Sequence, residues 1–203
     1  MEPISLIFSI IILIMSVVIH EFSHGYVAEL LGDPTPRLDG RLTLNPLKHL
    51  ELFGSVIVPI ITSLGGFTFG WAKPVVWNPY NVKNRRLGEF LISAAGPASN
   101  LLIAVIFGFT IRYSTLFSGS FVNLAAYVVL VNIVLAVFNL IPIPPLDGSK
   151  ILFSLFPPTP RFERIRFSIE RYSLFLMVII VLFLWRLIAP IVPLLFTIIT
   201  GAK

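Results

Sequence analysis

Residues 4–24 have the sequence ISLIFSIIILIMSVVIHEFSH, in which an uncharged apolar run leads directly into two histidines and a glutamate. An α-helix rises 1.5 Å per residue, so a helix that begins near Ile4 carries His20 roughly 24 Å along its axis. The hydrocarbon core of a bilayer is about 30 Å thick. We therefore expect His20, Glu21 and His24 to lie at membrane depth near the far boundary, where ionisable residues are rare and usually functional.

The composition of the 203-residue chain supports a membrane location. Hydrophobic residues make up 56% and charged residues 12%, against about 45–50% and about 25% in soluble domains. So few charges could not cover a soluble surface, which excludes soluble enzymes, nucleic-acid-binding proteins and disordered adaptors. The net charge of +5 is explained by basic residues flanking the spans. The chain has no cysteine, and this excludes disulfides and thiolate nucleophiles.

Charge-poor runs predict an all-α polytopic membrane protein with about four transmembrane helices. The first run continues as an amphipathic helix to Leu31, where Gly32-Asp33-Pro34 should end it. Further spans are expected at Phe90–Ile111, from about Phe121 to Phe138, and within Tyr172–Ala202. The oligomeric state stays open.

Lysine and arginine residues outside the spans form three clusters, at 37–48, 73–86 and 150–171. The positive-inside rule places these clusters in the cytoplasm and the N-terminus outside the cell membrane. The uncharged run Leu52–Ala72 lies between two of the clusters, so we expect it to be re-entrant or to lie along the surface. Alternating glycines and aromatic residues within it suit a β-ribbon better than a helix; these are Gly65, Gly66, Phe67, Phe69 and Trp71.

The HEFSH sequence at 20–24 has the spacing of a metal site. His20 and His24 share one helix face, so both imidazoles can bind one metal ion while Glu21 lies beside a bound water molecule. Chance matches to this pattern are common in soluble helices and rare within a membrane span. A catalytic zinc site normally has three protein ligands and one open position, so a third ligand is needed at the same depth.

Apart from Glu21, Asp147 is the one carboxylate within or at the end of an otherwise charge-free run. It belongs to the segment NLIPIPPLDG at 139–148, in which three prolines block a helix and Gly148 permits a sharp turn. This arrangement could direct the carboxylate toward a neighbouring helix. From spacing alone, a metal ligand and an interfacial turn residue fit Asp147 equally well.

Together, these segments resemble the site-2 protease family of intramembrane zinc metalloproteases. HEFSH at 20–24 is similar to the family motif HExxH, and NLIPIPPLDG at 139–148 is similar to N-x-x-P-x-P-x-L-D-G. GPASN at 96–100 is similar to G-P-x-x-N. The resemblance covers roughly Ile4–Leu155. The chain resembles the minimal branch of the family, because no stretch between the spans is long enough for a PDZ domain.

The resemblance implies one zinc ion per chain, bound by His20, His24 and Asp147, with Glu21 as the general base. It implies hydrolysis of a peptide bond in or near a transmembrane segment of another membrane protein, as in regulated intramembrane proteolysis. The active site is then expected toward the cytoplasmic side of the bilayer.

The family motifs also suggest that Asn100 and Asn139 hold the substrate backbone or the oxyanion. Hydrogen bonding between helices would explain both asparagines as well. The resemblance further favours a membrane-embedded ribbon at Gly65–Trp71, against which an extended substrate could pair.

The chain divides into a protease core at 1–156, a basic proline-rich connector at 157–171 and a hydrophobic segment at 172–203 that matches no motif. We expect the basic run Arg161–Arg171 to face solvent or lipid phosphates. Glu29 and Asp33 are expected to be surface or capping residues, and His49 to order a loop or lie at the interface.

Two other functions fit part of this pattern. A metal-ion transporter or metal-sensing membrane protein could use the same His/His/Asp site, but it would have no need of a carboxylate beside the imidazoles. A pseudoprotease that binds membrane proteins without cutting them fits poorly, because every catalytic position is filled.

Overall fold

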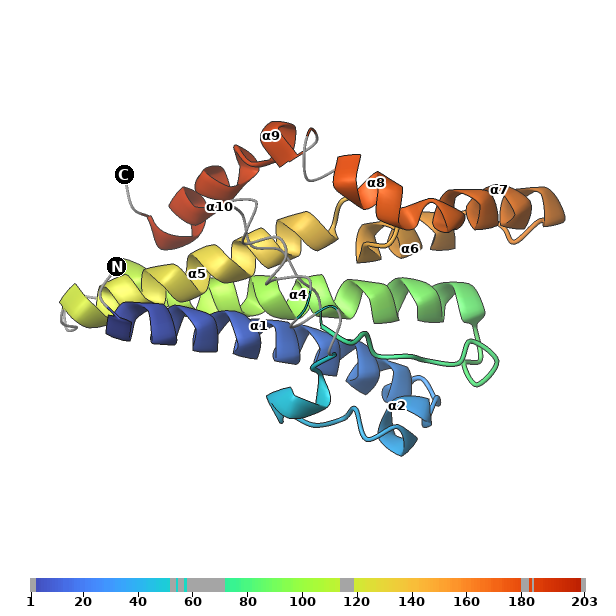
Figure 1. Ribbon diagram of the computed structural model, residues 1–203, viewed down its shortest axis with the longest axis horizontal. Coiled ribbons are helices and arrows are strands. Elements are labelled where there is room, and N and C mark those ends of the chain that lie inside the picture. Colours follow the sequence, from blue (N-terminus) through green and yellow to red (C-terminus); the bar gives the residue numbers. More distant parts are fainter. Residues whose placement is uncertain are drawn as a thin grey trace.

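The computed structural model describes residues 3–51, 72–113, 119–179 and 185–201, together with residues 54, 57 and 183. Within these residues the chain is helical and contains no strand, so the all-α prediction is confirmed there. Three of the described helices are long and apolar enough to cross a membrane. They are α1 (Pro3–Leu30), α4 (Arg85–Arg112) and α5 (Gly119–Asn139), which form the central bundle in Figure 1.

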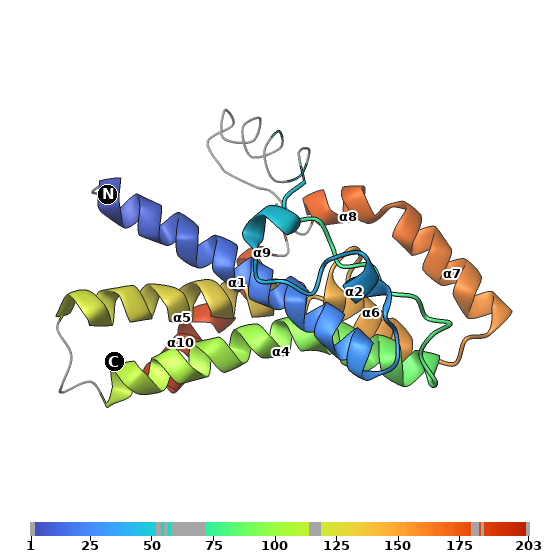
Figure 2. The same cartoon turned by 90° about the horizontal axis from the view of Figure 1, so that it is seen from below.

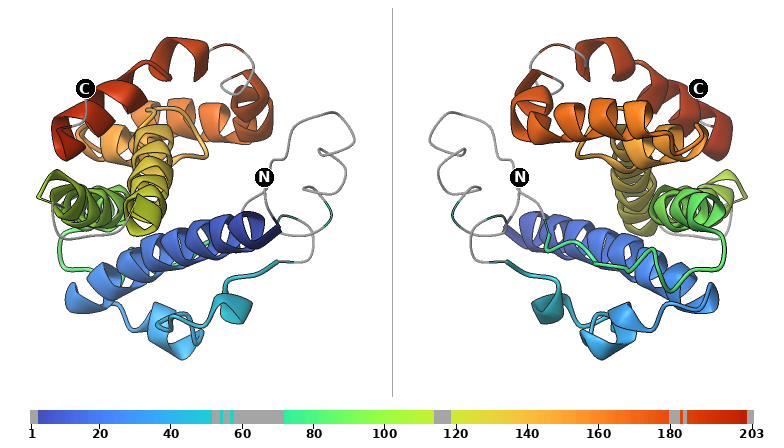
Figure 3. Two further views of the ribbon diagram at one scale, coloured as in Figure 1. Left: turned by 90° about the vertical axis from the view of Figure 1, so that its left-hand side faces the viewer. Right: turned by 90° about the vertical axis from the view of Figure 1, so that its right-hand side faces the viewer.

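Shorter helices cover the two sides and one end of this bundle. They are α2 (Thr35–Leu38), the 3-10 helix η1 (Pro46–Lys48), α6 (Asp147–Ser154), α7 (Pro160–Arg171), α8 (Ser173–Ile179), α9 (Trp185–Ile188) and α10 (Ile191–Thr200). Helix α1 crosses α4 obliquely (Figure 2). Viewed from the end, α4 and α5 lie between α1 on one side and the C-terminal helices on the other (Figure 3).

The helices pack through small and branched side chains. Ala104 of α4, Val129 and Ile133 of α5 and Val192 of α10 are buried in one cluster. A residue as small as Ala104 lets neighbouring helix backbones approach closely, which is how helices associate when lipid provides no hydrophobic driving force. This packing fixes α4 relative to α5 and α10.

The predicted spans agree with the observed helices except at two places. Helix α4 begins at Arg85, five residues before the expected Phe90, because the Asn84 side chain caps it by accepting a hydrogen bond from the Leu87 N–H at 3.1 Å. Over the predicted fourth span, the described helices are short, and the longest of them, α10, has 10 residues. The expected ribbon at 65–71 lies outside the described residues.

Of the two roles expected for Asp33, surface or capping, the surface role is wrong. Asp33 follows α1 and is fully buried. Its carboxylate accepts hydrogen bonds from the Thr35 N–H and hydroxyl at 3.1 and 2.6 Å, the Asn78 N–H at 2.6 Å and the Asn81 amide at 2.7 Å. Asp33 thereby holds the end of α1 against the chain that leads into α4. His49 is also buried, and its Nε2–H donates to the Thr43 carbonyl at 2.8 Å, which orders its loop.

The basic run 161–171 forms α7, and one of its arginines does not face solvent or lipid phosphates as expected. Arg166 donates two hydrogen bonds, at 2.5 and 3.1 Å, to the carboxylate of Glu89, a buried residue near the start of α4. Its guanidinium also lies 5.3 Å from the ring centroid of Phe153 in α6. Arg166 therefore attaches α7 to both α4 and α6.

Candidate metal centre

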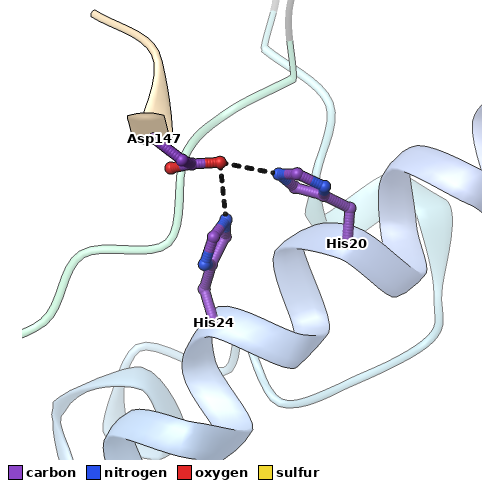
Figure 4. A group of neighbouring side chains, drawn as sticks. All are labelled: His20, His24 and Asp147. Atoms are coloured by element: carbon purple, nitrogen blue, oxygen red, sulfur yellow. Dashed lines mark hydrogen bonds and ion pairs between the residues drawn. The ribbon is translucent and has the colours of Figure 1, made fainter. Parts of the chain in front are cut away.

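Three side chains with metal-binding groups meet at the junction of α1 and α6. His20 and His24 project from successive turns of α1, and Asp147 is the first residue of α6 (Figure 4). Asp147 Oδ2 lies 3.1 Å from His20 Nε2 and 3.3 Å from His24 Nε2. All three residues are buried. The structure thus brings together the three residues that the sequence predicted as one site.

Helix α4 fixes the orientation of both imidazole rings. His20 Nδ1–H donates to the Asn100 side-chain oxygen at 2.6 Å, and His24 Nδ1–H donates to the Ile92 carbonyl at 2.6 Å. Both partners can only accept a hydrogen bond, so each neutral ring carries its proton on Nδ1. Each Nε2 then presents a lone pair toward Asp147, which is the form that binds a metal.

A single face of α4 makes this arrangement possible. Ile92, Gly96 and Asn100 are four residues apart and share one side of the helix. A Cβ atom at Gly96 would lie 2.5 Å from Nε2 of His20 and 2.5 Å from Nε2 of His24. The outer two residues therefore hold the rings, and the glycine between them leaves the space in which both nitrogens converge.

Asp147 reaches the site because the chain breaks between α5 and α6. Residues 140–146 are not helical, and α6 starts at Asp147 itself. We predicted that Gly148 permits a sharp turn, and this is wrong, since Gly148 is helical and has no positive φ. A Cβ atom there would instead collide with the Leu140 and Ile141 carbonyl oxygens. The glycine allows the first turn of α6 to lie directly against the preceding segment.

The donor set fits a zinc ion. Two ligands bound to tetrahedral zinc at about 2.0–2.2 Å lie roughly 3.3–3.6 Å apart, close to the 3.1 and 3.3 Å separations of the Nε2 and Oδ2 atoms. The two Nε2 atoms converge on one carboxylate oxygen, and a cation between them would satisfy all three groups. Two nitrogens and one oxygen also leave a fourth tetrahedral position for a water molecule or substrate.

Glu21 is held beside this centre by residues 73–79, and this contact was not predicted from the sequence. Its Oε2 accepts a hydrogen bond from the Val75 N–H at 3.0 Å. In the same segment, the Lys73 N–H donates a hydrogen bond to the His49 carbonyl at 2.8 Å. Pro74 and Pro79 were the available signal, because they exclude a helix and leave an extended chain whose remaining N–H groups need partners.

The other predicted site residues lie in different surroundings. Asn100 is fully buried, and besides holding His20 it donates to the Asn132 side-chain oxygen at 2.8 Å. Asn139 is the last residue of α5 and donates back to the Leu135 carbonyl at 2.9 Å. Substrate or oxyanion binding by these asparagines stays a prediction. Asn132 and Ser16, which are hydrogen-bonded to each other and to Asn100, were not predicted from the sequence, although an asparagine inside the apolar span 121–138 was a visible signal.

Comparison with known proteins agrees with this site. A model described as peptidase family M50 matches residues 8–116 and 110–184. The "Putative zinc metalloprotease YwhC" of Bacillus subtilis is 37% identical over 187 residues, which make up 88% of this chain and 83% of that protein. The "Putative zinc metalloprotease Rip2" of Mycolicibacterium smegmatis is 33% identical over 141 residues, which make up 68% of this chain and 53% of that protein.

The two family matches between them include the HEFSH sequence and the segment that ends at Asp147 and Gly148. No solved structure matches the chain. The chain belongs to peptidase family M50, the site-2 protease family that its motifs resemble.

Proposed function

We propose that this protein is a zinc-dependent endopeptidase that hydrolyses a peptide bond in or near a transmembrane segment of another membrane protein. The buried convergence of His20, His24 and Asp147, with Glu21 held beside them, carries the proposal. Family membership supports a zinc metalloprotease. Its substrate and its part in regulated intramembrane proteolysis are inferred from the membrane location of the site.

One zinc ion per chain would be held by His20 Nε2, His24 Nε2 and an Asp147 carboxylate oxygen. When bound, zinc supplies a Lewis acid that polarises the scissile carbonyl and lowers the pKa of a water molecule. Glu21 accepts a proton from the attacking water and then donates it to the leaving amine nitrogen, so the proton is conserved across the reaction. The Val75 N–H holds Oε2, and this leaves Oε1 to carry the proton.

The substrate must be unwound before it is cut. A transmembrane helix satisfies its carbonyls with internal hydrogen bonds, so local unwinding has to expose the scissile carbonyl. Pairing of the unwound segment with a ribbon at Gly65–Trp71 stays a prediction on residues outside the described part of the chain.

We further propose that the protein lies in the cytoplasmic membrane with its N-terminus outside and its active site toward the cytoplasm. The membrane location follows from the three long apolar helices. The orientation is supported by the arginines at the start of α4 and in α7. Helix α7 and the start of α4 lie at the same end of the bundle as α6, whose first residue is Asp147 (Figure 1).

Replacing Glu21 tests this function and separates it from metal transport. Glu21→Gln removes the proton acceptor but keeps an oxygen that can accept the Val75 N–H. Cleavage of a transmembrane substrate by the purified full chain should fall by about 10²–10⁴-fold, while zinc content and thermal stability stay close to those of the wild type. The matched control is Glu29→Gln on the same helix, at a residue paired with Arg37, which should cleave normally. Full cleavage activity in Glu21→Gln would contradict the proposal.

A further inference from the structure

A continuous chain of buried polar groups leads from α5 to the metal centre. It joins Ser16 and His20 of α1, Asn100 of α4 and Asn132 of α5. The side chains of Asn100 and Asn132 are fully buried, and Ser16 and His20 are 4% and 5% exposed. Asn132 is hydrogen-bonded to Asn100 and to Ser16, which are 32 and 116 residues away from it in the sequence. Packing alone brings these groups together.

The contacts of Asn132, at the α5 end of this hydrogen-bonded network, determine the direction of every hydrogen bond in it. Asn132 Nδ2 donates to the Val128 carbonyl at 2.9 Å and to the Ser16 hydroxyl oxygen at 2.9 Å. A backbone carbonyl can only accept, so Nδ2 must face Val128, and the Asn132 oxygen must face Asn100. Side-chain amide orientations are normally assigned and not observed, but here the carbonyl leaves a single choice.

The same reasoning extends to His20. Asn100 Nδ2 donates to the Asn132 oxygen at 2.8 Å and to the Ser16 carbonyl at 3.3 Å. The Asn100 oxygen is therefore the atom that accepts the His20 Nδ1–H. Reversing either amide would place two donors or two acceptors against each other without water to relieve them, at about 1–3 kcal/mol for each group left unpaired.

We propose that Asn132, supported by Ser16, is a positioning residue for the metal centre that acts through Asn100 on His20. It holds the Asn100 amide in the orientation that keeps the His20 proton on Nδ1 and the Nε2 lone pair directed at the metal. Asn132 also lies seven residues before the end of α5, the helix that leads to Asp147. The residue thereby links the placement of one metal ligand to the orientation of another. This inference rests on the proposed zinc-dependent function.

Helix association is the competing explanation. Hydrogen bonds between membrane helices contribute about 0.6–2 kcal/mol, and Asn132 could serve only that purpose. Such a role predicts lower stability with unchanged metal binding. The positioning role predicts a change at the metal, because groups that orient metal-bound histidines typically affect affinity by about 10–100-fold.

Asn132→Leu in the full chain distinguishes the two roles. It keeps a side chain of similar size and removes the acceptor for Asn100. Zinc affinity, measured by competition with a chelator, should fall by about 10–100-fold, and the visible absorption of the cobalt-substituted protein should change. Asn123→Leu is the matched control, since Asn123 is an exposed residue of the same helix and should leave both measurements unchanged. Wild-type affinity and spectrum in Asn132→Leu would overturn the inference.

Asn132→Asp covers the case in which Asn132→Leu does not fold. A protonated aspartic acid is close in shape, accepts from Asn100 and donates to the Val128 carbonyl, so zinc affinity should fall by less than the ~10-fold expected when the orienting contact is lost. An aspartate variant that folds but binds zinc as weakly as a variant lacking His20 would contradict the positioning role.

Nitrogen NMR of histidine in the metal-free protein tests the network without a metal. In the wild type, His20 should carry a proton on Nδ1 that is hydrogen-bonded to Asn100, whatever the protonation of Nε2 beside Asp147. This Nδ1 proton should be lost in Asn132→Leu, and its retention there would overturn the inference. If the wild type itself binds no zinc, the proposed function fails, whereas the tautomer measurement still decides whether the network orients His20.

Discussion

At the scale of single residues, Gly96 is the position where the smallest change should have the largest effect. Glycine in a helix interior is ordinarily less favourable than alanine by about 1 kcal/mol. Here a Cβ atom would occupy the space into which the Nε2 atoms of His20 and His24 project. The metal centre therefore requires glycine at position 96, where the absence of a Cβ atom leaves room for both Nε2 atoms.

Gly96→Ala should therefore abolish zinc binding even though alanine favours the helix. We expect zinc affinity to fall by more than about 100-fold, exceeding the usual effect of residues that only orient a ligand. The measurement is chelator competition on the purified protein. Gly108→Ala, on the same helix, would bring its methyl group into collision with Cγ2 of Ile199 in α10, so it tests a comparable clash away from the metal centre and should leave zinc affinity unchanged. A Gly96→Ala protein with wild-type affinity would mean that the rings can bind metal from another position.

At the scale of elements, Asp33 joins the end of α1 to the chain preceding α4. Burial opposes ionisation of its carboxyl, but hydrogen bonds from Thr35, Asn81 and Asn78 outweigh this effect and hold the pKa of Asp33 below its ordinary value of 3.8. A lowered pKa in the folded protein means that the ionised form stabilises it. That stabilisation is complete above the unfolded-state pKa and is lost as the pH falls through the folded-state pKa.

Asp33→Asn should reveal this contribution. At neutral pH the variant should be less stable by about 1–3 kcal/mol, because an amide nitrogen replaces one of two accepting oxygens. The difference from the wild type should shrink as the pH falls below about 4. Thermal unfolding at a series of pH values measures it, with Asp39→Asn at an exposed position as the control. A difference that does not depend on pH would show that ionised Asp33 contributes nothing.

The attachment of α7 is a second contact between elements. The side chains of Arg166 and Glu89 are 17% and 10% exposed, and their bidentate ion pair holds α7 against α4. Burial lowers the pKa of Arg166, but its hydrogen bonds and ion pairs with Glu89 and Glu170 outweigh this effect and raise the pKa above its ordinary value. The guanidinium therefore stays charged. Loss of either partner leaves a charge in a largely dry position.

A double-mutant cycle should detect this ion pair. Glu89→Gln and Arg166→Met should each destabilise the protein, and the double variant should lose less than the sum, with a coupling of roughly 1–3 kcal/mol. Unfolding of the four proteins gives the value. Arg164→Met, at an exposed position of α7, should show no coupling with Glu89→Gln. Additive losses would mean that Arg166 and Glu89 act independently.

At the scale of the whole molecule, the site exists only because two distant parts of the chain pack together. Asp147 lies 127 residues after His20 and reaches it through the break between α5 and α6. The packing of α4 against α1, α5 and α6 holds these parts in register. A site assembled in this way should be sensitive to the loss of any one ligand.

Asp147→Ala should remove zinc binding and proteolysis together. Two imidazoles alone bind zinc weakly, so the affinity should fall by more than about 100-fold, and cleavage should become undetectable. Glu163→Ala, in the first turn of α7, should do neither. Zinc content and substrate cleavage of the same preparations check both statements. Retention of zinc by Asp147→Ala would remove this residue from the ligand set and weaken the protease assignment.

The sequence was sufficient for three of the four expected membrane helices and for proposing which residues bind the metal. Apolar runs and the i, i+4 spacing of His20 and His24 are local properties, so they can be predicted without knowing how the chain folds. Asp147 could be nominated because it is a charge in an apolar run, but spacing alone left an interfacial turn equally possible. The resemblance to the family motifs then favoured the prediction that Asp147 is a metal ligand.

Only the tertiary structure showed how the site is held together. The roles of Gly96 and Gly148 depend on which atoms approach a position where no side chain exists. The burial of Asp33 and the pairing of Arg166 with Glu89 depend on partners 45 to 77 residues away. The orientation of His20 depends on amides from two other helices. The spacing of residues in the sequence predicts which side chains share a face of one helix. Hydrogen bonds and close contacts between helices form only when packing removes water from the facing surfaces, so spacing does not predict them.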